Sequence, residues 1–302
     1  ALCLTVREMK NIWYVHPYAG GPGVGRYSRP FFLAQHWARE GARVTIFSAS
    51  SHHLLDVPQK EGGRVIEGVN YEFIETPGYK GNGLGRLWNM ARLCFGFLRN
   101  YGRYAARYGA PDVVIASSPH PYIFLATHFV ARRFFAKSFF EVRDLWPLSL
   151  IELAGVSPRH PFIFFTGLVE KFAYRRADRV VSLLPMTADH MISMGMSERK
   201  WAYIPNGIDS REMLQLEPNC SLTEVVNKWK SEGCVVFIYA GALGRPNHVE
   251  SLIRATKILK EKEIAAIKVI IVGRGECESE LRFTVKDLAL EGDILVCGQI
   301  KK

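Results

Sequence analysis

The chain has 302 residues, 48% of them hydrophobic and 23% charged, with a formal net charge of +10 at pH 7. This composition is typical of a folded globular chain and excludes an intrinsically disordered one. No apolar run approaches the roughly 18 residues of a membrane-spanning helix. The six cysteines are scattered, without a C-x-x-C pair. The sequence therefore predicts neither a disulfide framework nor a zinc site, and it favours a cytoplasmic location.

The positive charge is confined to the first part of the chain. Up to Pro205 there are 25 Lys and Arg residues against 15 Asp and Glu, whereas from Asn206 onward there are 14 of each. A basic part beside a neutral part indicates that the basic part meets a polyanion.

The opening segment predicts a βαβ unit with a glycine-rich loop. Residues 11–16 read as a buried strand, a loop and a helix follow, and residues 43–48 read as the next strand. The loop glycines at 20, 21, 23 and 25 do not fit G-x-G-x-x-G, and the second strand ends in Phe47-Ser-Ala-Ser without an acidic residue. A nicotinamide-dependent enzyme is therefore disfavoured, while a loop for another phosphate or a sugar stays open.

A basic amphipathic helix is predicted next. Between Glu75 and Asp112 there is no acidic residue. Helical projection separates an apolar face from the arginines, with Trp88 and Phe95 at the boundary. This helix either packs on the sheet as an ordinary surface helix or also contacts anionic lipid. Nucleic acid is not expected, because no nucleic-acid motif accompanies the charge. The predicted apolar face comprises Leu87, Met90, Ala91, Cys94, Phe97, Leu98, Tyr101, Ala105 and Tyr108, and the basic residues are Lys80, Arg86, Arg92, Arg99, Arg103 and Arg107.

Two polar segments follow neighbouring predicted strands. Ser117-Ser-Pro-His-Pro121 comes after the strand at 111–116, and Arg143-Asp144 ends the strand at 138–144. The carboxyl ends of strands are where α/β sheets place their ligands. His120, Arg143 and Asp144 are therefore candidate catalytic residues. Alternatively, His120 is an exposed turn residue and Arg143 pairs with Asp144.

The second part of the chain again alternates strands and helices. After a predicted linker at 210–222, a buried strand at 235–239 runs into Gly241 and Gly244, and the strand at 268–272 runs into Gly273 and Gly275. A strand, a glycine turn and a helix N-terminus can hold an anionic ligand, although an ordinary βα turn has the same pattern. The last predicted strand, 293–298, is followed by little chain, so we expect a domain cut short at its C-terminus.

Four motifs together resemble the retaining, nucleotide-sugar-dependent glycosyltransferases of family 4. They are the Gly20-Gly21 loop, Ile-Pro-Asn-Gly-Ile-Asp at 204–209, Tyr-Ala-Gly-Ala-Leu-Gly at 239–244 and Val-Gly-Arg-Gly at 272–275. Ser-Ser-Pro with Val-Arg-Asp-Leu-Trp-Pro is similar to the bacterial surface-polysaccharide subgroup that transfers N-acetyl-fucosamine-type sugars. The resemblance implies the α/β GT-B fold of two doubly wound, Rossmann-like domains. These would be an acceptor domain at 9–209 and an incomplete nucleotide-sugar domain at 223–302.

The resemblance implies transfer of a sugar from a UDP-sugar donor, with retention and without a metal. The acceptor would be a saccharide or a polyprenyl-diphosphate-linked sugar of O-antigen or capsule synthesis. The protein would then lie on the cytoplasmic face of the inner membrane and contact it through the helix at 86–107. The implied donor-binding residues are Asn206, Gly241, Ala242, Leu243, Gly244, Arg245, His248, Gly273 and Gly275. The implied acceptor or phosphate loop consists of Gly20, Gly21, Gly23, Tyr27 and Arg29.

The chain departs from the family pattern in three places. Arg143-Asp144 stands where many members have His-Asp or His-Thr, and Ala242 and His248 stand where many have Arg and Lys. The family's paired glutamates would lie beyond Lys302, so we expect the 302-residue chain alone to be inactive. Two other interpretations stay open: a UDP-N-acetylglucosamine 2-epimerase of similar architecture, or a non-catalytic protein that binds nucleotide-sugar or membrane.

Overall fold

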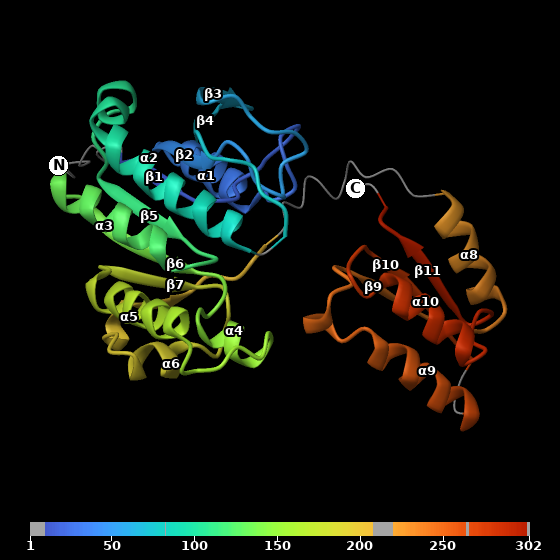
Figure 1. Ribbon diagram of the computed structural model, residues 1–302. Coiled ribbons are helices and arrows are strands. Elements are labelled where there is room, and N and C mark those ends of the chain that lie inside the picture. The colour runs from blue at the N-terminus through green and yellow to red at the C-terminus, as the bar shows by residue number, and fades with distance from the viewer. Residues whose placement is uncertain (1–9, 82, 208–219, 264–265, 301–302) are drawn as a thin grey trace, which may run out of the picture. The chain divides into compact units, whose positions relative to one another are not determined.

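The computed structural model describes residues 10–81, 83–207, 220–263 and 266–300 (Figure 1). The chain divides into two compact units, one ending at Gly207 and the other beginning at Ile208. Most of the predicted linker at 210–222 lies outside the described residues, and a helix that the sequence did not predict, α8 (Cys220–Ser231), begins within it.

The N-terminal unit is built on an eight-stranded sheet in the order β3-β4-β2-β1-β5-β6-β7-β8. Every neighbouring pair is parallel except β3 and β4, which form an antiparallel hairpin. The central strand β1 contributes Trp13, Tyr14 and Val15, all fully buried. This burial follows from helices covering both faces of a parallel sheet. The strands are β1 (Asn11–Val15), β2 (Arg43–Ala49), β3 (Gly62–Ile66), β4 (Val69–Ile74), β5 (Val113–Ser117), β6 (Lys137–Val142), β7 (Arg179–Ser182) and β8 (Trp201–Tyr203).

Helices pack on both faces of this sheet (Figure 1). Leu93 of α2, Phe124 of α3 and Tyr174 of α5 share one core cluster, whereas Phe31 of α1 packs with Tyr71 on the opposite face. The predicted doubly wound α/β architecture is confirmed. The helices are α1 (Arg29–Arg39), α2 (Leu84–Tyr108), α3 (Tyr122–Arg133), α4 (Leu148–Glu152), α5 (Pro161–Arg176), α6 (Ala188–Ser193) and the short 3-10 helix η1 (Glu198–Lys200).

The apolar face predicted for α2 is only partly correct. Met90, Phe97 and Tyr108 are buried as predicted, but Leu93 and Tyr104 are buried as well. Of the other predicted members, Ala91 is exposed and the rest are half-buried. The helix packs against α3 as well as against the sheet, and a projection of the sequence does not include this second neighbour.

The second unit has a three-stranded parallel sheet in the order β11-β10-β9. Helices α9 and α10 pack on it through Ile253 and Leu281, which share one core with Leu243 of the turn after β9. The strand at 235–239 was predicted to be buried, and that prediction is wrong: Phe237 is 50% and Ile238 60% exposed. Among the described strands β9 lies at the edge of the sheet, so its side chains lack a neighbour on that side. The elements are β9 (Val235–Ala240), η2 (Arg245–Asn247), α9 (Glu250–Glu261), β10 (Ile267–Val272), α10 (Glu278–Asp287) and β11 (Ile294–Gly298).

Candidate active site

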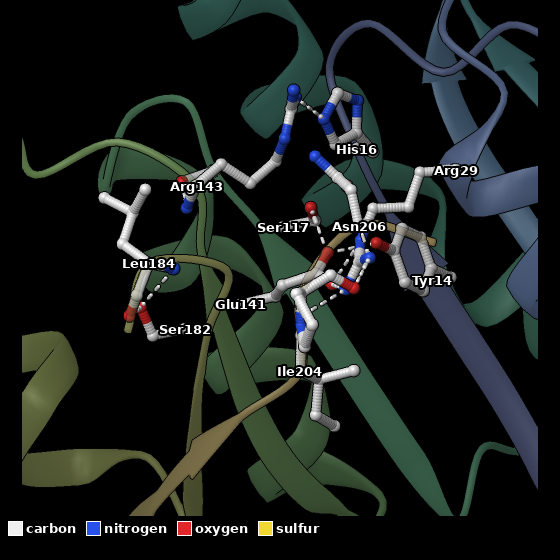
Figure 2. A network of polar contacts seen from close by, with 12 residues as sticks. Tyr14, His16, Arg29, Ser117, Glu141, Arg143, Ser182, Leu184, Ile204 and Asn206 are labelled. Atoms are coloured by element: carbon white, nitrogen blue, oxygen red, sulfur yellow. Dashed lines mark hydrogen bonds and ion pairs between the residues drawn. The ribbon is translucent and has the colours of Figure 1, made fainter. Parts of the chain in front are cut away.

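Polar side chains gather at the carboxyl ends of β1, β5 and β6 in the N-terminal unit (Figure 2). His16 directly follows β1, the segment from Ser118 to His120 follows β5, and Arg143 follows β6. The chain runs from β1 outward to β2 on one side, and β5 begins the other side. Ligands of α/β proteins bind at such a reversal of strand order.

Arg143 lies between His16 and Tyr27. Its Nη1 atom is 2.8 Å from Nε2 of His16, and its Cζ atom is 3.9 Å from the centroid of the Tyr27 ring. The Tyr27 ring stacks on His16 with 4.6 Å between centroids. These contacts hold a guanidinium group beside two rings at the strand ends.

The His16 ring is neutral and faces two donors. Burial, and then the charge of Arg143, hold the pKa of His16 well below its usual value. Nδ1 of the ring accepts from the backbone amide of Tyr18 over 2.9 Å, while Nε2 faces Arg143. A neutral imidazole accepts at only one nitrogen. One of the two donors that face the ring therefore has no acceptor there. Arg143 can give up its contact with His16 and donate to an oxygen atom of a substrate at little cost in free energy.

His120 is completely buried, so the alternative of an exposed turn residue is wrong. Burial lowers its pKa to about 3, which keeps the ring neutral at physiological pH. Within the part of the chain that the structure describes, neither ring nitrogen has a hydrogen-bond partner, and the same is true of the Tyr27 hydroxyl and Nε of Arg143. Buried polar atoms normally have partners, so these three side chains have capacity to bind a ligand.

The structure shows no ion pair between the described residues Asp144 and Arg143. The Arg143 guanidinium contacts His16 and Tyr27 instead. Partial desolvation raises the pKa of Asp144, and the positive charges of Arg143 and Arg86 oppose that rise. The carboxyl group nevertheless reaches solvent. Its raised pKa makes it a better proton acceptor than an ordinary aspartate.

The glycine loop folds on itself. The amide of Gly20 donates to the carbonyl of Tyr27 over 2.8 Å, and the amide of Gly21 donates to that of Gly25 over 3.1 Å. A Cβ atom at Gly20 would lie 2.6 Å from the carbonyl carbon of Gly25. The first two glycines therefore permit a tight loop that brings Tyr27 to His16. These two glycines were predicted to line a phosphate. This geometry does not favour that role, because their amides already donate to backbone carbonyls. Gly23, with φ +65, has open space around it.

Arg29 is not available to the acceptor, contrary to its predicted role in the loop. Its Nη2 atom is 2.9 Å from Oε1 of Glu141, and both side chains are nearly buried. Glu141 also accepts from the hydroxyl groups of Tyr14 and Ser117 (Figure 2). Four donor atoms therefore satisfy a carboxylate that would be costly to bury alone. The sequence carried a signal that was missed: an acidic residue within the apolar strand at 139–142 must have a buried partner.

The same guanidinium group of Arg29 also holds the last described segment of the N-terminal unit. Its guanidinium donates to the carbonyl oxygens of Pro205 over 2.8 Å and Ile204 over 3.1 Å. It also donates to Oδ1 of Asn206 over 3.3 Å. Asn206, predicted to bind the donor, therefore has an intramolecular partner in the N-terminal unit.

The second unit brings several predicted donor residues together around a cavity of about 320 Å³. Arg245 and His248 line it beside the N-terminus of α9. The sequence predicts an anion site at this helix N-terminus, and that site stays a prediction. The lining residues are Leu243, Gly244, Arg245, His248, Val249, Glu250, Cys277, Glu280 and Leu281.

The two glycine turns of this unit pack against each other. A Cβ atom at Gly273 would lie 1.8 Å from the carbonyl oxygen of Gly241, and one at Gly275 would lie 2.3 Å from that of Leu243. The amides of Gly241 and Leu243 donate to the carbonyls of Val272 and Arg274. These glycines therefore serve close backbone contact, and the amides of Gly241 and Leu243 are already bonded. Of the residues predicted to hold the donor diphosphate, Gly244, Arg245 and His248 remain candidates.

A family model described as a glycosyl transferase 4-like domain matches residues 23–207, well over half of the chain. This chain belongs to the glycosyl transferase 4-like family. Membership places it among the glycosyltransferases, and the match covers nearly all of the N-terminal unit with its Arg143 site. A search of curated protein sequences found no match.

Solved structures share the fold of this family member. Sucrose-phosphate synthase from Thermosynechococcus elongatus aligns with a TM-score of 0.65 and 15% identity, over 97% of this chain and 71% of that chain. HepE from Anabaena, solved in complex with UDP-glucose, aligns with a TM-score of 0.59 and 15% identity, over 97% and 70%. WaaG, a glycosyltransferase involved in lipopolysaccharide biosynthesis, aligns with a TM-score of 0.60 and 13% identity, over 96% and 70%. At such identity these likenesses establish the GT-B fold, as predicted.

The arginines of α2 have acidic neighbours that the local sequence does not contain. Arg103 lies 3.7 Å from Glu61, Arg107 lies 3.5 Å from Glu72, and Arg92 lies 4.0 Å from Glu75. The hairpin of β3 and β4 supplies Glu72, and its flanks supply the other two. The positive charge of this helix is therefore lower than its sequence indicates.

In the described residues no helix combines the length and apolar character needed to cross a bilayer. Nor do three or more His, Cys, Asp or Glu side chains gather there as a metal site would require. The expectation of a metal-independent reaction stays a prediction.

Proposed function

We propose that this protein transfers a sugar from a UDP-sugar donor to an acceptor, with retention at the anomeric carbon. The observation that carries the proposal is the Arg143 site, which lies within the region matched by the family model. A guanidinium held beside a neutral histidine can exchange that contact for a substrate oxygen. The complex of HepE with UDP-glucose supports a UDP-linked donor, because HepE shares the fold of this chain.

The chemistry needs a cation where negative charge develops. In the transfer the acceptor hydroxyl bonds to the anomeric carbon, the bond to the donor diphosphate breaks, and the hydroxyl loses its proton. Positive groups fixed near the departing diphosphate stabilise that charge. We assign Arg245 and the N-terminus of α9 to the diphosphate. Arg143 and His120 would bind substrate oxygens, and Asp144 would accept the acceptor proton.

We propose that the acceptor is a saccharide or a polyprenyl-diphosphate-linked sugar of a bacterial surface polysaccharide such as O-antigen or capsule. The donor sugar would be of the N-acetyl-fucosamine type, as the Ser-Ser-Pro and Val-Arg-Asp-Leu-Trp-Pro segments suggest. A polyprenyl-diphosphate-linked acceptor lies in the cytoplasmic leaflet of the inner membrane. A location of the protein there would account for its basic N-terminal part, and the helix at 86–107 is the contact that the sequence predicts.

An assay of sugar transfer tests this proposal, with the protein that the gene encodes. The protein is incubated with labelled UDP-sugars and extracted bacterial polyprenyl lipid, and label and released UDP are measured. We expect label in the lipid or saccharide fraction with one UDP released for each sugar. Conversion of UDP-N-acetylglucosamine to its 2-epimer without transfer would replace the proposal with the epimerase. Nucleotide binding without either product would favour the non-catalytic alternative.

A further inference from the structure

Helices α3 and α5 pack side by side, and both carry large apolar side chains that are exposed. Phe129 of α3 is 55% exposed, and Phe164, Phe165 and Leu168 of α5 are 68%, 55% and 50% exposed. Side chains of this size gathered on two adjacent helices are unusual on a monomer and mark a binding surface. We call this the aromatic face, consisting of Leu125, Phe129, Phe164, Phe165, Leu168 and Phe172.

Both helices that carry the aromatic face end in arginines. Arg132 and Arg133 end α3, and Arg175 and Arg176 end α5. The only acidic residue in either helix is Glu170. It is 2% exposed and accepts a hydrogen bond from Tyr174 over 2.8 Å. No carboxylate of these two helices therefore reaches their exposed surface.

One of these arginines contacts a ring of the aromatic face. Cζ of Arg176 lies 5.9 Å from the centroid of the Phe172 ring. Asp178, which follows α5, lies 3.5 Å from Lys137 and is thereby partly neutralised. Exposed phenylalanines beside arginines are suited to the boundary between lipid headgroups and acyl chains, where rings enter the apolar layer and guanidinium groups meet phosphates.

A line of ring contacts joins this surface to the candidate active site. The Tyr122 ring lies 5.7 Å from the ring of buried His120 and stacks on exposed Phe165 at 6.1 Å. Tyr122 is the first residue of α3 and follows the carboxyl end of β5. The aromatic face therefore begins next to the residues that would receive an acceptor sugar.

We propose that the aromatic face of α3 and α5 binds the surface of an anionic lipid bilayer, with the phenylalanines of α5 as the apolar anchor. This places the main contact on α5 and not on α2, whose arginines are partly neutralised by Glu61, Glu72 and Glu75. The inference deepens the proposed function, on which it rests only for the lipid-linked acceptor. Binding itself requires no catalysis.

The experiment is flotation of the 302-residue chain with vesicles of equimolar phosphatidylglycerol and phosphatidylcholine, and with vesicles of phosphatidylcholine alone. The double variant Phe164→Ser/Phe165→Ser tests the face. Phe283→Ser on α10 is the matched control, because Phe283 is 69% exposed and lies in the second unit. We expect the wild type and the control to bind the anionic vesicles, and the double variant to lose roughly tenfold or more in partition coefficient.

Two results would overturn the proposal. In the first, the double variant binds the vesicles as the wild type does, whereas Arg99→Gln/Arg103→Gln does not bind. That result would show that α2 makes the membrane contact. The other is absence of vesicle binding together with a wild-type dimer, seen by sedimentation velocity, that the double variant abolishes. That result would make the face an interface between two copies of the chain. Thermal unfolding of each variant controls for folding, and UDP binding by the same samples reports separately on the proposed function.

Discussion

Arg29 and Glu141 form an ion pair inside the N-terminal unit, with 2.9 Å between Nη2 and Oε1 (Figure 2). Arg29 is the first residue of α1 and Glu141 lies near the end of β6, so the pair joins two distant segments of the chain. Through the carbonyls of Ile204 and Pro205 it also joins the end of the unit. One guanidinium group therefore joins the start of α1 to β6 and to residues 204–206.

Arg29→Ala should destabilise the N-terminal unit by about 3–5 kcal/mol, because it leaves the Glu141 carboxylate buried without its cation. Urea unfolding followed by tryptophan fluorescence measures this, since Trp13, Trp37 and Trp201 all lie in that unit. Arg39→Ala on the same helix is the control and should change the free energy of unfolding by less than about 0.5 kcal/mol. Equal effects of the two variants would contradict a structural role for the pair.

The N-terminal unit should lose stability as the pH falls below about 6.5. Burial holds the pKa of His120 at about 3 and that of His52 at about 4, and lowers the pKa of His16 as well. The unfolded chain therefore binds protons that the folded chain excludes. The stability is complete above the unfolded pKa and is lost as pH falls toward the folded pKa.

His120→Gln isolates one of these groups. Between pH 7 and pH 5 the variant should lose about 2 kcal/mol less unfolding free energy than the wild type, since each pH unit below 6.5 costs one buried neutral histidine about 1.4 kcal/mol. Urea midpoints at the two pH values give the comparison. Identical pH dependence in the two proteins would show that His120 is protonated in the folded state.

Gly273→Ala should disrupt the second unit. A Cβ atom at this position meets the carbonyl oxygen of Gly241 at 1.8 Å, so the two glycine turns would have to separate. Gly292→Ala is the control, because a Cβ atom there meets nothing within 4 Å. We expect loss of more than about 3 kcal/mol for the first variant and less than about 1 kcal/mol for the second. Near-UV circular dichroism and urea unfolding measure both, and a stable Gly273→Ala protein would show that the turns are not in contact.

Arg143→Lys should lower the rate of sugar transfer by roughly 10²–10³ if Arg143 stabilises charge in the transition state. Lysine keeps the charge but loses the planar group that stacks on Tyr27 and reaches His16. Tyr27→Phe keeps the ring and removes a hydroxyl without a described partner, so its rate should fall far less. The turnover number of the protein encoded by the gene decides this. Equal rates for wild type and Arg143→Lys would remove Arg143 from the chemistry.

The sequence predicted the fold well because strand and helix periodicity is local. The strands at 11–16, 43–48 and 268–272 all occur within a residue or two of their predicted bounds. It failed where packing decides. The exposed edge strand β9 contains the same apolar residues as a buried strand, and only the sheet order shows that it lacks a neighbour.

The candidate site was predicted in part for the same reason. His120 and Arg143 were found from their positions after strands. The environment of His16 and the partners of Arg29 depend on residues more than a hundred positions away. Likewise, the acids that neutralise α2 come from residues 61–75, outside the helix whose charge they change.

The most direct test of a UDP-sugar transferase is saturation-transfer NMR of UDP with the 302-residue chain, which detects weak binding and needs no turnover. The wild type should show transfer to the UDP protons. Arg245→Gln, in the cavity beside α9, should reduce it strongly, whereas Lys257→Gln, on α9 but outside the cavity lining, should not. Absence of transfer at millimolar UDP, or equal signals from all three proteins, would contradict the assignment of this cavity to the donor nucleotide.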